Sequence, residues 1–160
     1  MTAPSLAAQI VVFRLGDDWF AADVFAVERV LRYKAPTAIP DVPSWIVGVL
    51  EYQKRVAPII DLRRRFNLAP AEATPETRIL VLVADGEWIG AVVDAVVEVV
   101  AIDEAAVAPP PPMFRGIAGE YVRGLLRRHD RLVIVLDIAR LLSTNDKLTL
   151  DQARSGAPHG

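Results

Sequence analysis

The chain has 160 residues, of which 52% are hydrophobic and 24% are charged, and its 18 Lys and Arg against 20 Asp and Glu give a formal net charge of −2. A chain of this length and composition buries most of its apolar surface, so we expect a folded globular protein. The absence of Cys excludes a disulfide scaffold and a thiolate metal site, and the slightly acidic balance argues against a general nucleic-acid binder.

The predicted elements begin with a β-hairpin. Ile10–Leu15 is an apolar run of strand length, a Gly-Asp-Asp turn follows it, and Trp19–Ala22 returns as the second strand. The same order of strand, turn and strand recurs at 78–92, so Trp19 and Trp88 occupy equivalent places. The hairpin is therefore part of an internal repeat.

A longer repeated unit lies downstream of each hairpin. Ile46–Phe66 aligns without a gap with Val122–Leu142, and five identical positions mark the match: Gly48 with Gly124, Leu50 with Leu126, Arg55 with Arg131, Asp61 with Asp137, and Arg64 with Arg140. Each copy has the pattern of two short strands around a polar loop, followed by an Asp that is suited to cap a short helix. The repeat thus covers nearly the whole chain.

These repeats divide the sequence into two similar halves. We predict a first barrel at about 10–66, a linker rich in Ala, Pro, Glu and Thr at 67–77, a second barrel at about 78–142 and a flexible tail at 143–160. Close-set turns and the lack of a long amphipathic helix favour an all-β fold of two small barrels with short helices. Because a half of about 60 residues is only marginally stable alone, we expect the halves to share a core.

Groups that perform catalysis are scarce. His129 lies in a predicted loop and His159 is next to the last residue; neither has a second His or Cys at ligand spacing, so we expect no metal site. Gly116–Gly119 is a lone GxxG outside the strand-to-helix context of a phosphate loop, so we expect no cofactor and no enzyme. No segment resembles a signal peptide or reaches the roughly 20 apolar residues of a membrane span, which predicts a cytoplasmic protein without direct membrane insertion.

Basic residues cluster only locally. Arg63–Arg65 follows the capping Asp of the first copy, and Arg127 and Arg128 lie in the second predicted hairpin loop. A solvated helix face is the simplest interpretation of the triplet, and an acidic partner surface is the other. A pair of barrels that binds nucleic acid through these arginines stays an alternative, which predicts binding that weakens steeply with salt.

Two segments, Val24–Tyr33 and Val92–Val100, hold more apolar residues than a half-buried strand can hide. Periodicity is compatible with two interpretations. They are either interior strands buried on both faces or strands that present an apolar surface to a partner.

Seven stretches follow one another in a fixed order between residues 10 and 142: VVFRLGDDWFAADVFAVERVLRY, IPDVPSWIVGVL, RVAPIIDLRRRF, TRILVLVADGEWIGAVVDAVVEVV, PPPP, EYVRGLL and RLVIVLDIARLL. This order closely resembles the CheW-like family of bacterial chemotaxis coupling proteins. The resemblance implies a CheW-like fold of two pseudo-symmetric five-stranded SH3-like β-barrels, in agreement with the duplicated pattern.

The resemblance also implies partners. A protein of this kind is an adaptor without catalytic activity that joins the regulatory domain of a CheA-type histidine kinase to the cytoplasmic tip of chemoreceptors. It implies a protein that is monomeric in isolation, oligomeric within arrays, and recruited from the cytoplasm to membrane-associated receptor arrays. Receptor tips are expected to dock in an apolar groove between the barrels.

Seven residues are the partner-binding candidates that the resemblance indicates. Val27 and Val30 match apolar positions on the strand used in partner binding, and Val97 and Val99 are the candidates for the groove in the second half. Gly48 opens the repeated motif, where a Cβ would push away a partner or a neighbouring strand. Gln53 and Lys54 complete the set.

The loop that holds Gln53 and Lys54 departs from the family pattern. The family usually has Asn-Leu-Arg-Gly there, with the arginine as a contact residue, whereas this chain has Gln53 in the place of the arginine and moves the charge to Lys54. The core pattern is intact while contact positions differ, which suggests a divergent member with its own kinase or receptor set, including a pilus-linked or other non-flagellar pathway.

Overall fold

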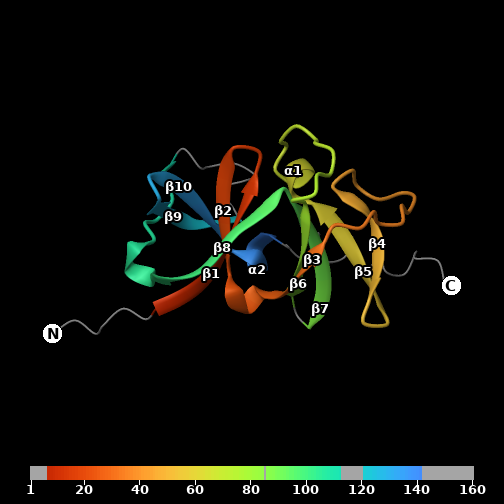
Figure 1. Cartoon of the computed structure of the whole chain (residues 1–160), viewed down its shortest axis with the longest axis horizontal. Helices are drawn as coiled ribbons and strands as arrows, with labels where there is room; N and C mark the ends of the chain where they lie inside the picture. Colours follow the sequence, from red (N-terminus) through yellow and green to blue (C-terminus); the bar gives the residue numbers. More distant parts are fainter. Residues whose placement is uncertain (1–6, 85, 113–120, 142–160) are drawn as a thin grey trace.

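The computed structural model describes residues 7–84, 86–112 and 121–141 (Figure 1). These residues form ten strands: β1 (Ala7–Leu15), β2 (Asp18–Asp23), β3 (Val27–Arg32), β4 (Ile46–Tyr52), β5 (Arg55–Asp61), β6 (Arg78–Ala84), β7 (Glu87–Val93), β8 (Ala95–Asp103), β9 (Val122–Arg128) and β10 (Arg131–Leu136). The helices are short: α1 (Leu62–Arg65), α2 (Ile138–Leu141), and the 3-10 turns η1 (Val24–Ala26) and η2 (Glu104–Ala106). The all-β prediction with short helices is confirmed, and the predicted tail lies outside the described residues.

The strands form two five-stranded sheets with the same internal plan. Barrel A has the order β8-β1-β2-β10-β9 and barrel B the order β3-β6-β7-β5-β4. In each, one hairpin joins another through a parallel pair, β2 with β10 in barrel A and β7 with β5 in barrel B. The predicted pair of pseudo-symmetric five-stranded sheets is therefore confirmed.

The assignment of one barrel to each half of the sequence is wrong. Barrel B is built from residues 27–93, whereas barrel A combines residues 7–23 with 95–136. The predicted linker at 67–77 therefore lies within barrel B, between β5 and β6. Asp94 alone separates β7 from β8, and one residue is too short for a hairpin turn, so β8 continues into the other sheet.

Each sheet closes through a single bridge on the chain that follows its edge strand. After β3, Thr37 pairs with Val49 of β4, with N–H to oxygen distances of 2.9 Å in both directions. After β8, Ala108 pairs with Leu125 of β9, with both hydrogen bonds at 2.8 Å. The two bridges occupy equivalent places, and they turn the sheets into barrels.

The repeated glycines explain how these bridges are possible. A Cβ on Gly48 would lie 2.3 Å from the carbonyl oxygen of Thr37, and a Cβ on Gly124 would lie 2.4 Å from the carbonyl oxygen of Ala108. Gly48 also has a φ of +149°, a conformation that side-chain-bearing residues rarely adopt. The glycine of the repeat therefore permits the close approach that closes each barrel.

The main hydrophobic core lies between the barrels and draws on both. Its buried side chains come from the outer faces of the two sheets, including Val11, Phe13 and Phe20 of barrel A and Leu80, Leu82 and Ile89 of barrel B. Phe66, which caps the end of α1, stacks on Phe20 with ring centroids 5.6 Å apart. The expectation that the two halves share a core is confirmed, and we call this cluster the shared core.

The equivalence of the two tryptophans is confirmed by their contacts. The guanidinium of Arg55 lies 5.2 Å from the ring centroid of Trp88, and that of Arg131 lies 4.9 Å from that of Trp19. Each tryptophan is thus covered by the arginine at the same position of the repeat, an attraction between a cation and a ring face.

Asp94 ties the barrels together at the crossover. Its carboxylate accepts hydrogen bonds from the guanidinium of Arg63 at 2.9 and 3.1 Å, and from the amide of Gly16 at 2.6 Å. Burial acts to raise the pKa of Asp94, but the hydrogen bonds from Arg63 and Gly16 and the charges of Arg63 and Arg14 outweigh it and hold the pKa below its ordinary value. The carboxylate therefore stabilises the folded protein in its charged form.

We expect Asp94→Asn to lower the free energy of unfolding at neutral pH by about 2 kcal/mol, because Arg63 loses its anionic partner in a largely buried place. A depressed folded-state pKa contributes stability above the unfolded-state pKa of about 4, and this contribution disappears as the pH falls through the lower folded-state value. Urea unfolding between pH 7 and pH 3 measures both effects, and the difference in free energy of unfolding between variant and wild type should become smaller toward the acid end.

Glu76→Gln is the matched control for Asp94→Asn. Glu76 pairs with Arg14 at 3.3 Å, but its side chain is largely exposed, so this substitution should leave stability nearly unchanged at every pH. A gap between Asp94→Asn and wild type that stays constant down to pH 3 would contradict the assignment of the effect to the charged carboxylate.

Candidate functional site

Two edge strands, β3 of barrel B and β8 of barrel A, carry the predicted valines. Residues opposite each other in an antiparallel pair point to the same face of a sheet. Val27 lies opposite Leu82 and Val30 opposite Leu80, both of which belong to the shared core. The two valines of β3 therefore lie on the face of barrel B that is turned toward barrel A.

The valines of β8 lie on the matching face of barrel A. Val99 is opposite Val11, a residue of the shared core. Val97 is the extra residue of a bulge, since β1 has Val12 opposite Glu98 and the next residue opposite Val96. Figure 1 shows β8 crossing the middle of the molecule, with β3 to its right. We call Val27, Val30, Val97 and Val99 the valine rim, because they continue the shared core to its exposed edges.

Three of the four valines of the valine rim present an apolar surface to solvent. Val99 is 58% exposed, Val30 39% and Val97 38%, whereas Val27 is half-buried and packs against the shared core. The two interpretations of the apolar segments are thus both partly right. One face of each strand is interior, and the other leaves apolar side chains in solvent, as binding surfaces do.

Phe25 is a candidate that the sequence reasoning missed as a single residue. It lies on η1, directly before β3, and its side chain is 90% exposed. The Asp23 carboxylate accepts a hydrogen bond from the Phe25 amide at 2.9 Å and so holds this turn. The excess of apolar residues in 24–33 was the indication, but only the short turn shows which aromatic side chain points outward.

Gly48 lies apart from the valine rim. The close approach that its sequence position predicts is to the neighbouring chain at Thr37, within barrel B. A partner-binding role for Gly48 stays a prediction, and the structure supplies a folding role that is sufficient to explain the residue.

Gln53 and Lys54 form the tight turn between β4 and β5. Both have left-handed backbone angles, φ 48° and 65°, and His129 and Asp130 at the equivalent turn have φ 51° and 58°. The amide nitrogen of the Gln53 side chain donates to the Tyr52 hydroxyl at 3.3 Å. The loop therefore has the same backbone conformation as the equivalent turn of barrel A, and it carries an amide and an ammonium group.

The turn is strained at Lys54, because a left-handed backbone suits Gly, Asn or Asp. We expect Lys54→Gly to raise the free energy of unfolding by about 1 kcal/mol in urea titrations. Asp130→Gly at the equivalent turn is the matched control and should gain less, since Asp tolerates this conformation. A loss of stability in Lys54→Gly would contradict this prediction, and it would show that contacts of the lysine side chain stabilise the turn by more than its backbone strain destabilises it.

The arginine triplet is engaged within the protein. Arg63 binds Asp94, Arg64 donates to the Ser44 carbonyl oxygen at 3.1 Å, and Arg65 bonds the Tyr121 hydroxyl and lies 5.0 Å from the Trp45 ring centroid. The prediction of a solvated helix face is therefore wrong for Arg63 and Arg65, whereas Arg64 is exposed as predicted. The cause is the helix itself, whose single turn directs all three side chains onto neighbouring elements.

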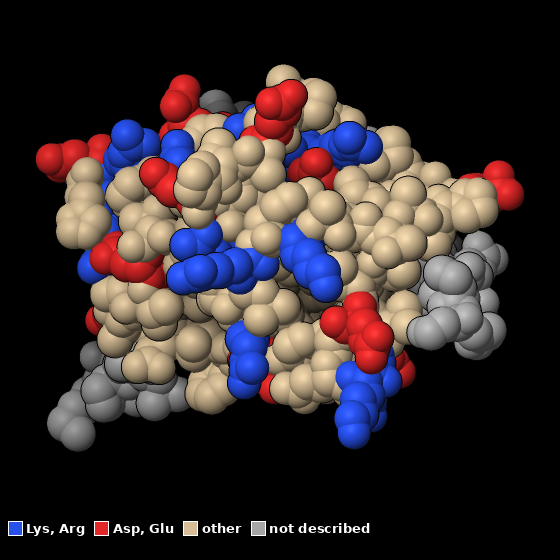
Figure 2. Space-filling model, turned by 45° about the vertical axis from the view of Figure 1, so that its right-hand side comes forward, with Lys and Arg blue, Asp and Glu red and all other residues tan. Residues whose placement is uncertain are grey.

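The second basic cluster is also paired in part. Arg128 donates to Glu98 on β8, and this hydrogen bond holds the pKa of Glu98 below its ordinary value. On the face seen in Figure 2, Lys and Arg lie in separate groups with acidic side chains close to most of them. The arginines that the nucleic-acid alternative relied on, Arg63–Arg65 and Arg128, are thus engaged within the protein, which argues against that alternative.

The described part of the chain holds neither a cluster of metal ligands nor a membrane-spanning helix. Within 7–84, 86–112 and 121–141, no three His, Asp or Glu side chains come together as a metal site would require. In the same ranges no helix is long and apolar enough to cross a bilayer. Gly116–Gly119 and His159 lie outside the described residues.

Comparison with known proteins places the chain in a family. The model of the CheW-like domain matches residues 9–146. The chain is 30% identical to chemotaxis protein CheW of Treponema pallidum over 144 residues, which span 86% of this chain and 84% of that protein. It is 31% identical to protein FrzA of Myxococcus xanthus over 134 residues, or 82% and 83% of the two chains.

A solved structure supports the same relationship. The crystal structure of the scaffolding protein TtCheW from Thermoanaerobacter tengcongensis superposes with a TM-score of 0.80 and 32% identity, covering 88% of this chain and 96% of that one. The family model, the relatives and the fold all agree over nearly the whole chain. The protein with the valine rim therefore belongs to the CheW-like family.

Proposed function

We propose that this protein is a non-enzymatic adaptor of a chemosensory pathway, which couples the cytoplasmic tip of chemoreceptors to the regulatory domain of a CheA-type histidine kinase. The observation that carries the proposal is the valine rim. In a protein of this family, apolar side chains on the two edge strands stay exposed on either side of the shared core. A helical receptor tip with apolar residues at helical spacing fits such a surface.

The kinase contact is proposed for a different part of the surface. The turn at Gln53 and Lys54 lies at the end of barrel B, where the family places an arginine, so a kinase matched to this protein should accept an amide and a displaced ammonium there. This substitution favours a dedicated kinase, and the alternative of a pilus-linked or other non-flagellar pathway follows from it. Recruitment from the cytoplasm to a membrane-associated array would then need no membrane contact by the adaptor.

The test is calorimetric titration of the purified protein with the regulatory domain of each CheA-type kinase of its own organism, with and without a receptor-tip fragment. Interfaces of this kind should have micromolar dissociation constants individually and gain strength by avidity in an array. Binding to one kinase supports the adaptor function and identifies the pathway. Failure to bind any kinase or receptor tip would refute it.

A further inference from the structure

The interior of barrel B is hollow where the interior of barrel A is packed. Inside barrel A, a buried cluster forms from Ile10, Val12, Ala21, Leu126, Val133 and Val135. The repeat places Ile79, Val81, Gly90, Leu50, Ala57 and Ile59 at the equivalent positions of barrel B, and these residues line a cavity of about 230 Å³. The two barrels therefore share one topology, but only the interior of barrel A is filled by side chains.

One substitution between the repeats contributes to the space. Ala57 stands where barrel A has Val133. Gly90 stands where barrel A has Ala21, but it leaves no space, because a Cβ there would lie 2.4 Å from Cδ1 of Ile59 and 2.9 Å from Cγ2 of Ile79. Close packing is the rule in protein interiors, and apolar cavities of only about 150 Å³ already take up small apolar molecules such as benzene. The cavity in barrel B is larger than that. Its inner wall, formed by Ala57, Ile59, Ile79, Val81 and Gly90, carries only aliphatic side chains, whereas Arg32, Lys34, Glu51 and Tyr52 also line it.

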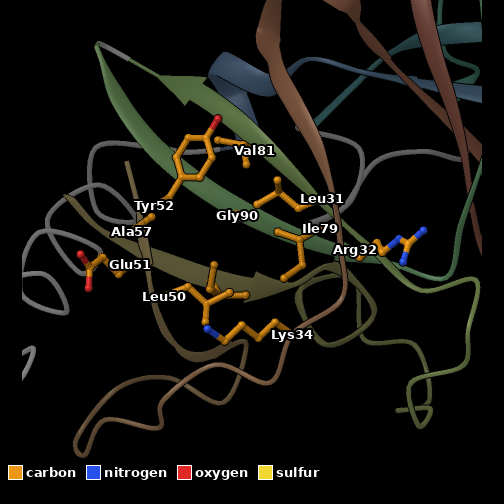
Figure 3. Close-up of a pocket in the computed structure, with 11 residues that line it drawn as sticks. Leu31, Arg32, Lys34, Leu50, Glu51, Tyr52, Ala57, Ile79, Val81 and Gly90 are labelled. Atoms are coloured by element: carbon orange, nitrogen blue, oxygen red, sulfur yellow. The ribbon is translucent and has the colours of Figure 1, made fainter. Parts of the chain in front are cut away.

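Three charged residues, Arg32, Lys34 and Glu51, contribute to the lining of the cavity. The opening lies between β3 and β4 and is lined by Leu31, Lys34, Leu50 and Tyr52 (Figure 3). The Lys34 side chain extends across the opening below Leu50, whereas Arg32 and Glu51 point away from it. Among the described residues, none forms an ion pair with Lys34, whereas Arg14, Arg63 and Arg64 are each paired with a carboxylate. An aliphatic chamber with a cation at its mouth is complementary to a small amphipathic anion.

We infer that barrel B binds a medium-chain aliphatic carboxylate, with its hydrocarbon chain inside the barrel and its carboxylate at Lys34. The inference goes beyond the adaptor function and does not depend on it, because β3 presents Leu31 to the cavity and Val30 to the opposite face. A ligand of this size, with about ten non-hydrogen atoms, should bind with a dissociation constant of about 1 mM or below.

The test is a titration of the full chain, carrying ¹³C-labelled Ile, Leu and Val methyl groups, with sodium octanoate and separately with octanol. Saturable shifts of the Ile59, Ile79 and Val81 methyl signals are expected with both ligands. Ala57→Leu should lower the affinity for both ligands at least about tenfold, because the larger side chain fills the cavity. Ala57→Val, which copies the packed barrel, serves the same purpose if the leucine variant does not fold.

The contribution of the cation is tested by Lys34→Gln. This variant should bind octanoate with about threefold lower affinity and bind octanol with unchanged affinity, because an exposed cation contributes only a small electrostatic attraction. Lys54→Gln, which removes a lysine outside the cavity lining, should change neither. The inference is overturned by the absence of saturable shifts up to about 10 mM ligand, by equal binding to Ala57→Leu, or by shifts confined to the valine rim. A response of these methyl groups to a protein partner but not to octanoate would also overturn it.

Discussion

Gly48→Ala and Gly124→Ala should each lower the free energy of unfolding by about 3 kcal/mol or more. In both variants the new methyl group would lie within 2.4 Å of a backbone carbonyl oxygen, that of Thr37 or of Ala108. A backbone atom cannot move aside as the end of a flexible side chain can. The variant must therefore open the bridge that closes its barrel, and urea unfolding followed by circular dichroism measures the loss.

Gly86→Ala separates this collision from the general cost of losing a glycine. Gly86 has a φ of +76°, but no atom lies within 4 Å of the place where its Cβ would be. The substitution should cost only about 1 kcal/mol, which is the strain of a left-handed backbone. If Gly48→Ala keeps wild-type stability and instead loses partner binding, the glycine is a contact residue and the bridge at Thr37 does not depend on it.

The local structure could be predicted from the sequence because it depends on neighbours in the chain. The hairpin turns, the strands around them and the capping role of Asp61 follow from residues a few positions apart, and the Asp61 carboxylate accepts from the Arg63 amide at 2.9 Å as expected. The repeat predicted two like sheets for the same reason, since equal patterns form equal units.

Which strands pair to form each sheet could not be predicted in this way. Both halves carry the same pattern, so a hairpin such as β1-β2 satisfies the hydrophobic pattern with either copy of the downstream unit. The choice is made by the connection between sheets, where Asp94 is too short to let β8 return beside β7. Fold class and repeat were therefore predictable, whereas the exchange of strands between the halves needed the structure.

The candidate site could also be predicted only in part. Sequence reasoning identified which strands carry surplus apolar residues, because that is a matter of composition and period. Which of those residues stay exposed depends on the opposing sheet, and the shared core takes up Val96 and part of Val27 while it leaves Val30 and Val99 in solvent. The contacts of Arg63–Arg65 with Asp94, Ser44 and Tyr121 could not be predicted for the same reason, since these partners lie 20 or more residues away in the sequence.

Val30→Asp and Val99→Asp should each weaken binding of a receptor-tip fragment by about 30-fold or more, the effect of losing a central apolar contact. Both side chains are exposed, so the folded protein can hold a carboxylate there, whereas a bound complex would have to remove that charge from water. Val27→Asp does not separate an effect on binding from an effect on folding. Its side chain packs against the shared core, so we expect it to reduce stability as well as binding.

Leu132→Asp is the matched control, because it makes the same chemical change at a residue that is 49% exposed on β10, away from the valine rim. Calorimetric titration with the receptor-tip fragment should show near wild-type affinity for this control, and thermal unfolding should show a cooperative transition for all three exposed variants. Wild-type affinity of Val30→Asp and Val99→Asp would place the receptor elsewhere on the protein. Loss of the unfolding transition in either variant would instead mean that the valine belongs to the core, and the exposed edges of β3 and β8 would then have to be tested through Phe25.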